Sequence, residues 1–173
     1  MMEGCMSTML GNQSIVLCKG LQQLKEEHSF LREKLDELLE GGQSLEKQQV
    51  QEENVTEFVQ KVRTFFNELE THSKKEETVL FPMMETYLGK DGGPIAVMEY
   101  EHEQARKTLQ LFMDESKNHL SAQDNDTIRT VLSYAIQAYS LLSVHFMKEE
   151  NVLFPMADQM LSEEEKATLN QNI

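Results

Sequence analysis

Hydrophobic residues recur along the N-terminal part of the chain at the spacing of a helix that buries one face. From about residue 14 to residue 40 they are separated by alternating steps of four and three, the pattern of an amphipathic helix packed along a bundle. One position of this stripe is a histidine, His28. The pair Gly41-Gly42 predicts the end of the helix, because glycine is a poor helix former. The apolar members of the stripe are Leu17, Leu21, Leu24, Leu31, Leu35 and Leu38.

Three further segments carry the same spacing. They run from about residue 45 to 88, from Pro94 to the polar stretch 121–126, and from that stretch to about residue 161. Pro82 and Pro155 predict kinks rather than ends, because the polar–apolar periodicity continues beyond both prolines. The apolar stripes consist of Phe58, Val62, Phe65, Leu69, Leu80 and Met83, then Ile95, Met98, Ala105, Leu109 and Phe112, then Val131, Ala135, Ala138, Leu142, Val152 and Met156.

Short polar or glycine-rich connections join the four segments. Long helices with short connections lie antiparallel to their neighbours, so the sequence predicts an all-α fold, an up-down-up-down four-helix bundle. We expect residues 1–13 to be a short N-terminal extension, residues 14–161 to be the bundle, and residues 162–173 to be a short C-terminal helix or tail. Ser162 and Glu165 fit a capping box that opens this last helix.

The chain also contains an internal repeat. Residues 72–85 read HSKKEETVLFPMME and residues 145–158 read HFMKEENVLFPMAD, with nine of 14 positions identical. The first and third segments match more weakly, through Glu27, His28, Arg32 and Leu35 against Glu101, His102, Arg106 and Leu109. The pattern indicates a duplicated helical hairpin, and a site on the axis between the two copies should have nearly equivalent halves.

Composition narrows the classes of function. The chain has 173 residues and a net charge of −14, which argues against nucleic acid or an anionic membrane as its partner. It has neither an apolar run long enough to span a bilayer nor a signal-peptide pattern, so we expect a cytoplasmic protein. Cys5 and Cys18 are therefore expected to be reduced thiols, and their spacing fits no common zinc motif.

A histidine interrupts each of the four apolar stripes, and in the second and fourth stripes a glutamate follows it by four residues. A carboxylate in an apolar core costs several kcal/mol, roughly, and a metal ion would offset this cost. Donor counting favours two metals, each with two histidines and both carboxylates bridging, with room for a solvent-derived bridge and a small ligand. Imidazole and carboxylate ligands suit iron or manganese, with zinc possible. The candidate ligands are His28, His72, Glu76, His102, His145 and Glu149.

These residues, including His72-x-x-x-Glu76 and His145-x-x-x-Glu149, resemble the hemerythrin-like HHE cation-binding domains over nearly the whole chain. The resemblance implies a four-helix bundle with a non-heme di-iron centre bridged by the two glutamates. It implies chemistry with oxygen, nitric oxide or peroxide, or iron handling. Oxygen-carrying hemerythrins have a further histidine where this chain has Arg106. The symmetric ligand set is more similar to bacterial stress-response proteins that help repair iron centres.

The function expected from the sequence is therefore binding of, or reaction with, a small diatomic ligand or peroxide, in a sensing or stress-protection role. The alternatives are an iron-donor or iron-centre repair protein, a di-iron peroxidase or oxidase, and an interaction bundle without metal, which metal analysis would distinguish. The order His-x-x-x-Glu with only two buried glutamates favours a metal- and gas-binding protein over a dedicated enzyme. The expected assembly is a monomer or homodimer.

Further charged residues lie near the candidate ligands. Arg32 and Arg106 follow two of the histidines by four positions, and could either extend along the flank of the bundle or donate to the bridging carboxylates. Glu27 and Glu101 directly precede two histidines; a solvated position is favoured over one that accepts a histidine N–H from a neighbouring helix.

Two further observations concern the surroundings of the ligands. Glu77 and Glu150 are expected at the surface, and each would be a substitute ligand if its helix were rotated. Ala105 occupies the position equivalent to Leu31 in the other repeat, so a small ligand would have more room beside His102.

Overall fold

The computed structural model describes residues 16–47, 52–119 and 125–173, and this part of the chain contains no strand. The predicted N-terminal extension, residues 1–13, lies outside the described residues. Two π-helical turns, η1 and η2, continue α2 and α5 directly into α3 and α6. The elements in chain order are α1 (Lys19–Lys47), α2 (Glu52–Lys75), η1 (Glu76–Leu80), α3 (Phe81–Leu88), α4 (Pro94–His119), α5 (Asn125–Lys148), η2 (Glu149–Leu153), α6 (Phe154–Met160) and α7 (Glu163–Asn172).

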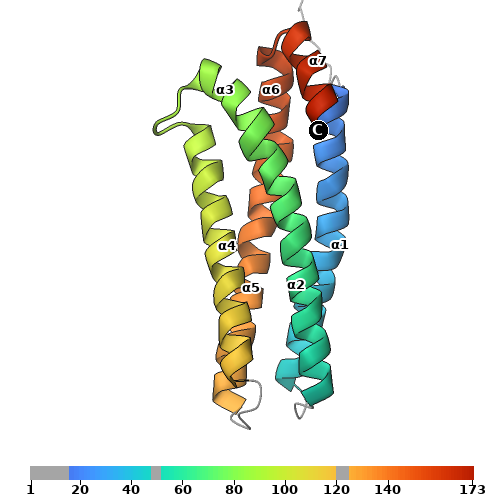
Figure 1. The fold of residues 1–173 in the computed structure, drawn as a ribbon, viewed down its shortest axis with the longest axis vertical. Helices are drawn as coiled ribbons and strands as arrows, with labels where there is room; N and C mark the ends of the chain where they lie inside the picture. Colours follow the sequence, from blue (N-terminus) through green and yellow to red (C-terminus); the bar gives the residue numbers. More distant parts are fainter. Residues whose placement is uncertain (1–15, 48–51, 120–124) are drawn as a thin grey trace, which may run out of the picture.

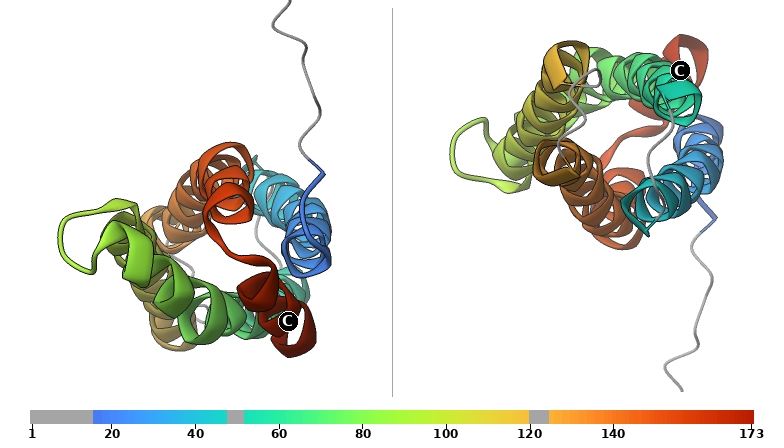
Figure 2. Two further views of the ribbon diagram at one scale, coloured as in Figure 1. Left: turned by 90° about the horizontal axis from the view of Figure 1, so that it is seen from above. Right: turned by 90° about the horizontal axis from the view of Figure 1, so that it is seen from below.

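The four long helices stand side by side and alternate in direction (Figure 1). Helix α1 packs against α2 and α5, and α4 packs against the same two helices, which closes the ring seen along the bundle axis (Figure 2). The predicted all-α, up-down-up-down four-helix bundle is confirmed.

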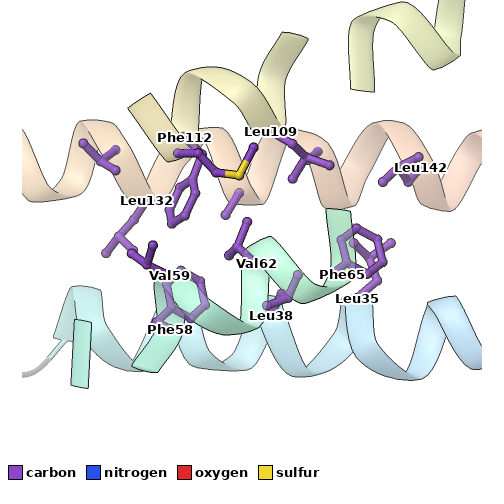
Figure 3. Close-up of a cluster of buried hydrophobic side chains, with 14 of the residues drawn as sticks. Leu35, Leu38, Phe58, Val59, Val62, Phe65, Leu109, Phe112, Leu132 and Leu142 are labelled. Carbon is purple, nitrogen blue, oxygen red and sulfur yellow. The ribbon is translucent and has the colours of Figure 1, made fainter. Parts of the chain in front are cut away.

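The apolar stripes meet inside the ring and form two buried clusters. The larger cluster combines residues of all four long helices, and Figure 3 shows Leu38, Phe58, Leu109 and Leu132 pointing toward one another. The second cluster contains Leu24, Phe81, Ile95 and Phe154 at the end of the bundle near α7, among others. On each of the four long helices, one histidine lies between residues of the larger cluster and residues of the second cluster. Apolar layers therefore enclose the level of the histidines on both sides.

The prediction that Gly41-Gly42 ends the first helix is wrong, because α1 continues through both residues to Lys47. The ring of Phe58 in α2 explains the choice of glycine. A Cβ atom at position 41 would lie 3.1 Å from two carbons of this ring, closer than nearly all real Cβ contacts. Glycine here permits a close approach of α1 and α2 and does not break the helix.

Both proline-containing helices continue across their prolines, each through a π-helical turn that precedes the proline. The backbone N–H of Phe81 donates to the carbonyl of Glu76, and that of Phe154 to Glu149, a spacing of five residues instead of four. The wider turn accommodates one additional residue and rotates the following residues around the helix axis.

This rotation corrects part of the predicted core. Leu80 is fully buried as predicted, but Val152 of the predicted stripe is exposed, and Leu153 is buried in its place. Met83 and Met156 are only half-buried, while the residues that follow them are fully buried. An uninterrupted period of 3.6 residues cannot give this register beyond a π turn. The residues that follow Met83 and Met156 are Met84 and Ala157.

Helix α7 covers the end of the bundle next to the N-terminus of α1 (Figure 1). It begins with the predicted capping box, in which the Ser162 hydroxyl accepts from the Glu165 N–H and the Glu165 carboxylate accepts from the Ser162 N–H. The backbone N–H of Gly20 donates to Asn170 Oδ1 at 2.6 Å, and Leu169 is fully buried. Of the helices described, none combines the length and the apolar character needed to cross a membrane.

Candidate metal centre

The six residues predicted as metal ligands meet at one level of the bundle, and none is more than 3% exposed. They form two groups that share both glutamates, and within each group one ligand atom from every residue lies within 4.8 Å of the others. The first group contains the histidines of α1 and α2, and the second contains those of α4 and α5. The six are His28 in α1, His72 in α2, Glu76 in η1, His102 in α4, His145 in α5 and Glu149 in η2.

Each pair of histidines presents two ring nitrogens to a common point. Nε2 of His28 lies 2.8 Å from Nε2 of His72, and Nε2 of His102 lies 2.9 Å from Nε2 of His145. Two nitrogens bound to one metal at about 2.0–2.1 Å and at a right angle would lie about 3 Å apart. The observed separations therefore fit two ligands of one ion in each half.

Every histidine is held from behind by a carboxylate. His28 Nδ1 lies 3.1 Å from Glu150, and His72 Nδ1 lies 3.0 Å from Glu27. A carboxylate only accepts hydrogen bonds, so each of these Nδ1 atoms carries the proton. In a neutral ring, Nε2 then has no proton and presents a lone pair.

The second pair repeats this arrangement, with His102 Nδ1 at 2.7 Å from Glu77 and His145 Nδ1 at 3.1 Å from Glu101. Two lone pairs that face each other at under 3 Å repel unless a cation lies between them. The cation can be a metal ion or a proton. The tautomers fixed by the four outer carboxylates therefore create two cation sites, one in each half.

A basic side chain pairs with each of the four outer carboxylates. Two of these bases are arginines that follow a ligand histidine by four residues, and two are lysines that follow one by three. Each half thus has one histidine backed by a Glu–Arg pair and one backed by a Glu–Lys pair. The pairs are Arg32 with Glu150 at 2.5 Å, Arg106 with Glu77 at 2.8 Å, Lys75 with Glu27 at 2.5 Å, and Lys148 with Glu101.

These contacts hold the outer carboxylates in the charged form. Burial would raise the pKa of Glu27, but hydrogen bonds from His72 and Lys75 lower it to about 2. The pKa values of Glu77 and Glu150 are lowered against the effect of burial by hydrogen bonds from a histidine and an arginine, and that of Glu101 is lowered first by its bond from His145. An ionised carboxylate behind each ring raises the basicity of the ligand nitrogen on the far side.

Several expectations for this outer layer were wrong. Glu27 and Glu101 were expected on a solvated face. Instead, each accepts a hydrogen bond from a histidine of a neighbouring helix, as in the less favoured alternative. Glu77 and Glu150, expected at the surface, are half-buried, and each accepts a hydrogen bond from a ligand histidine. The remaining correction concerns Arg32 and Arg106, which donate to outer carboxylates and not to the two central glutamates.

Sequence reasoning also missed Lys75 and Lys148 altogether. The signal that could have identified the outer layer is the repeat itself, which retains the whole segment Lys-Glu-Glu at 75–77 and 148–150. The prediction failed for Glu77 and Glu150 because it assumed an unbroken α-helix, whereas both residues lie in π-helical turns.

The two central glutamates show what the site lacks without a cation. All four carboxylate oxygens of Glu76 and Glu149 are buried, and none accepts a hydrogen bond from the residues described. Histidine Nε2 atoms approach them at 3.2–4.0 Å, but these nitrogens point at the centre of each group. A buried carboxylate without partners is costly, and a metal bound to both groups would satisfy these oxygens. The residues present therefore fit a pair of metal ions.

In the absence of metal, protons take this role. Burial would lower the pKa of His72, but the charge of Glu76 and the hydrogen bond to Glu27 raise it to about 10. Burial likewise opposes the rise for His145, where Glu149 and Glu101 raise the pKa to about 9. His72 and His145 belong to different facing pairs, so each pair holds one additional proton, as the opposed lone pairs require.

The family model described as the Hemerythrin HHE cation binding domain matches residues 19–157. The chain belongs to this family. A hemerythrin domain binds metal, usually iron, and the six buried residues are the candidate ligands in this member.

Curated relatives include the "Iron-sulfur cluster repair protein YtfE" of Salmonella typhimurium, which is 33% identical over 133 residues. The proteins of the same name from Escherichia coli O157:H7 and Escherichia fergusonii are 32% identical over the same length. The aligned region covers 75% of this chain and 60% of each relative, so the chain spans about 60% of the length of these relatives.

Proposed function

We propose that this protein binds two iron ions and uses them to bind, or react with, a small diatomic ligand or peroxide. The observation that carries the proposal is the pair of opposed Nε2 lone pairs beside four carboxylate oxygens that accept no hydrogen bond from the described residues. One iron would be held by His28 and His72, and the other by His102 and His145. Glu76 and Glu149 would bridge the two.

The donor set favours iron and leaves coordination positions free. Two imidazole nitrogens and two carboxylate oxygens would give four donors to each ion, and about two positions would remain for a shared oxo or hydroxo bridge and an external ligand. Manganese would accept the same ligands, and zinc could occupy the site as a substitute. When bound, iron supplies the redox chemistry and the affinity for oxygen, nitric oxide or peroxide.

The protein residues supply orientation and exclude water. The outer carboxylates fix all four rings with Nε2 toward the centre, and their basic partners hold these carboxylates in place. The rings of Phe154 and Phe81 stack on His28 and His102 at centroid distances of 5.4 and 5.5 Å. An apolar surrounding of this kind limits the access of water to the site.

The names of the relatives support a second candidate, iron-centre repair, in which iron would leave this protein for a damaged acceptor. The YtfE proteins carry that function in their names, but this chain spans about 60% of their length. All six candidate ligands are almost fully buried, which favours retention of iron over rapid release. Transfer of 55Fe to an apo iron–sulfur acceptor separates the two candidates, because retained label supports ligand binding and rapid transfer supports repair.

Location and partners belong to the same proposal. A cytoplasmic protein of net charge −14 would repel nucleic acid and anionic membranes, which leaves the small ligand as its principal partner. We infer a monomer or homodimer that acts in sensing or stress protection.

The test is anaerobic loading with ferrous iron, followed by metal analysis and optical spectra before and after oxygen and nitric oxide. We expect two irons per chain and a spectral change with nitric oxide. Glu149→Gln should lose iron, whereas Glu99→Gln, at an exposed position of α4, should not. A single tightly held iron that survives Glu149→Gln would overturn the bridged centre.

A further inference from the structure

The two halves of the centre differ in the side chains that cover their histidines. The ring of His28 lies between two phenyl rings, with Phe146 stacked at a centroid distance of 4.4 Å and Phe154 at 5.4 Å. Phe146 is fully buried and also approaches His72, with centroids 6.3 Å apart. The first half therefore has two aromatic rings stacked on His28.

In the second half one phenyl ring stacks on a ligand histidine, while Phe146 approaches His145 in a tilted orientation with centroids 5.9 Å apart. Phe81 stacks on His102 at 5.5 Å and is the repeat equivalent of Phe154. The equivalent of Phe146 is Ser73, which is 2% exposed and lies on α2, a direct neighbour of α4. A hydroxymethyl group thus stands at the repeat-equivalent of the position from which Phe146 stacks on His28.

A second substitution reduces side-chain volume in the same half. Leu31 follows His28 by three residues, and its equivalent beside His102 is Ala105. Both positions are buried, so the difference in size lies inside the bundle. Ser73 and Ala105 come from different helices, yet each is smaller than its repeat equivalent, Phe146 and Leu31 respectively.

The hydroxyl of Ser73 is also unusual for a buried helical serine. Ser116, the other buried serine described, donates to the carbonyl of Phe112 four residues earlier at 2.6 Å. Thr71 and Thr78 in the same part of the chain do the same with Asn67 and Lys74. The described residues provide no hydrogen-bond partner for Ser73 Oγ. A polar ligand beside Ser73 would give this hydroxyl a hydrogen-bond acceptor.

We propose that a small hydrogen-bond acceptor binds in the His102–His145 half, where Ser73 Oγ donates to it and Ala105 leaves room for it. Phe146 and Leu31 close the other half. This inference rests on the proposed function, because the ligand must be held by the iron of that half. It assigns Ser73, Ala105, Phe146 and Leu31 as the residues that determine on which side the ligand binds.

The test uses azide with the diferric protein, monitored by its optical charge-transfer band and its infrared stretching frequency. Ser73→Ala should weaken azide binding about three- to tenfold, the value of one hydrogen bond, and shift the azide stretch. Ala105→Leu copies the other half and should weaken or slow binding by roughly tenfold or more, with two irons retained. Leu31→Ala should not weaken binding. A crystal structure with azide should show it within hydrogen-bond distance of Ser73 Oγ.

The matched control is Ser116→Ala, which removes an equally buried serine hydroxyl far from the histidines and should leave azide affinity and stretch unchanged. Iron content and melting curves accompany every variant. If Ala105→Leu does not retain iron, Ser73→Ala provides the test of this inference, because it removes only the hydroxyl oxygen. Wild-type affinity and stretch in Ser73→Ala, or azide on the His28 side in the crystal, would overturn this inference alone. A loaded wild-type protein that binds neither azide nor nitric oxide would overturn the proposed function and this inference with it.

Discussion

His28 and His72 face each other with Nε2 atoms 2.8 Å apart, and the Nδ1–H of each ring donates a hydrogen bond to a carboxylate. Neither Nε2 can donate to the other while both rings are neutral. The pair is therefore a site for one positive charge, and His102 with His145 forms the second such site. Metal ions and protons compete for both positions.

Proton release on metal loading follows directly. His72 and His145 have pKa values raised to about 10 and about 9, so the metal-free protein at pH 7 holds one additional proton in each pair. Binding of a metal to Nε2 must displace it. We expect about two protons to be released per chain when two ferrous ions bind at pH 7. Calorimetry in buffers of different ionisation enthalpy measures this number, and a value near zero would contradict the tautomers assigned to the rings.

The pH dependence of stability should differ between the metal-free and loaded protein. A histidine with a raised pKa stabilises the fold fully below its unfolded value, about 6.5, and this contribution is lost as pH rises through the folded value. The metal-free protein should therefore lose stability between about pH 7 and 10, as His72 and His145 deprotonate. Glu149, whose pKa is lowered chiefly by His145 against burial, contributes in the opposite sense and loses its contribution in acid.

Metal removal provides the comparison. Loaded protein has no titrating proton at Nε2, so its melting temperature should stay level over the alkaline range in which that of the metal-free protein falls. At neutral pH, chelation should lower the melting temperature by several degrees, roughly, because a ligand that binds only the folded state stabilises it. Identical melting curves with and without metal, at every pH from 7 to 10, would show that the buried groups are not coupled to a cation.

The outer carboxylates offer a test of orientation. Glu150→Ala removes the acceptor behind His28 and leaves Arg32 without its partner. Loss of such a partner typically weakens metal binding about 10- to 100-fold, and we expect this range in competition with a chelator. Arg32→Ala should have a smaller effect, since the carboxylate remains. Glu99→Ala, on an exposed part of α4, serves as the control and should bind metal as the wild type does.

The bundle and the six candidate ligands could be predicted from the sequence because their positions follow the 3.6-residue period of the α-helix. His28, His102 and the apolar residues around them follow the 3.6-residue repeat of unbroken α-helices, and all of the predicted residues in these two stripes are buried. The prediction lost register after Glu76 and Glu149, where a π-helical turn begins. Helical periodicity gives no warning of such a turn.

Contacts between helices were the other part that the sequence could not supply. Glu27 lies about 100° from the apolar stripe of its own helix, which favours solvent when one helix is considered alone. It is partly buried because His72 and Lys75 on α2 lie next to it. The same holds for Phe146, which stacks on His28 of the adjacent helix α1.

The glycine pair in α1 yields a prediction about packing. Alanine in a helix interior is more favourable than glycine by about 1 kcal/mol. At Gly42 a Cβ atom would lie 3.5 Å from Phe58, an ordinary contact, so Gly42→Ala should raise the free energy of unfolding by about 0.5–1 kcal/mol. At Gly41 the same atom would lie 3.1 Å from two ring carbons of Phe58, which is itself buried and cannot move freely. Gly41→Ala should therefore gain less than Gly42→Ala or destabilise the protein. Urea unfolding of both variants measures the difference, and an equal gain at the two positions would show that α1 and α2 are not in close contact at Gly41.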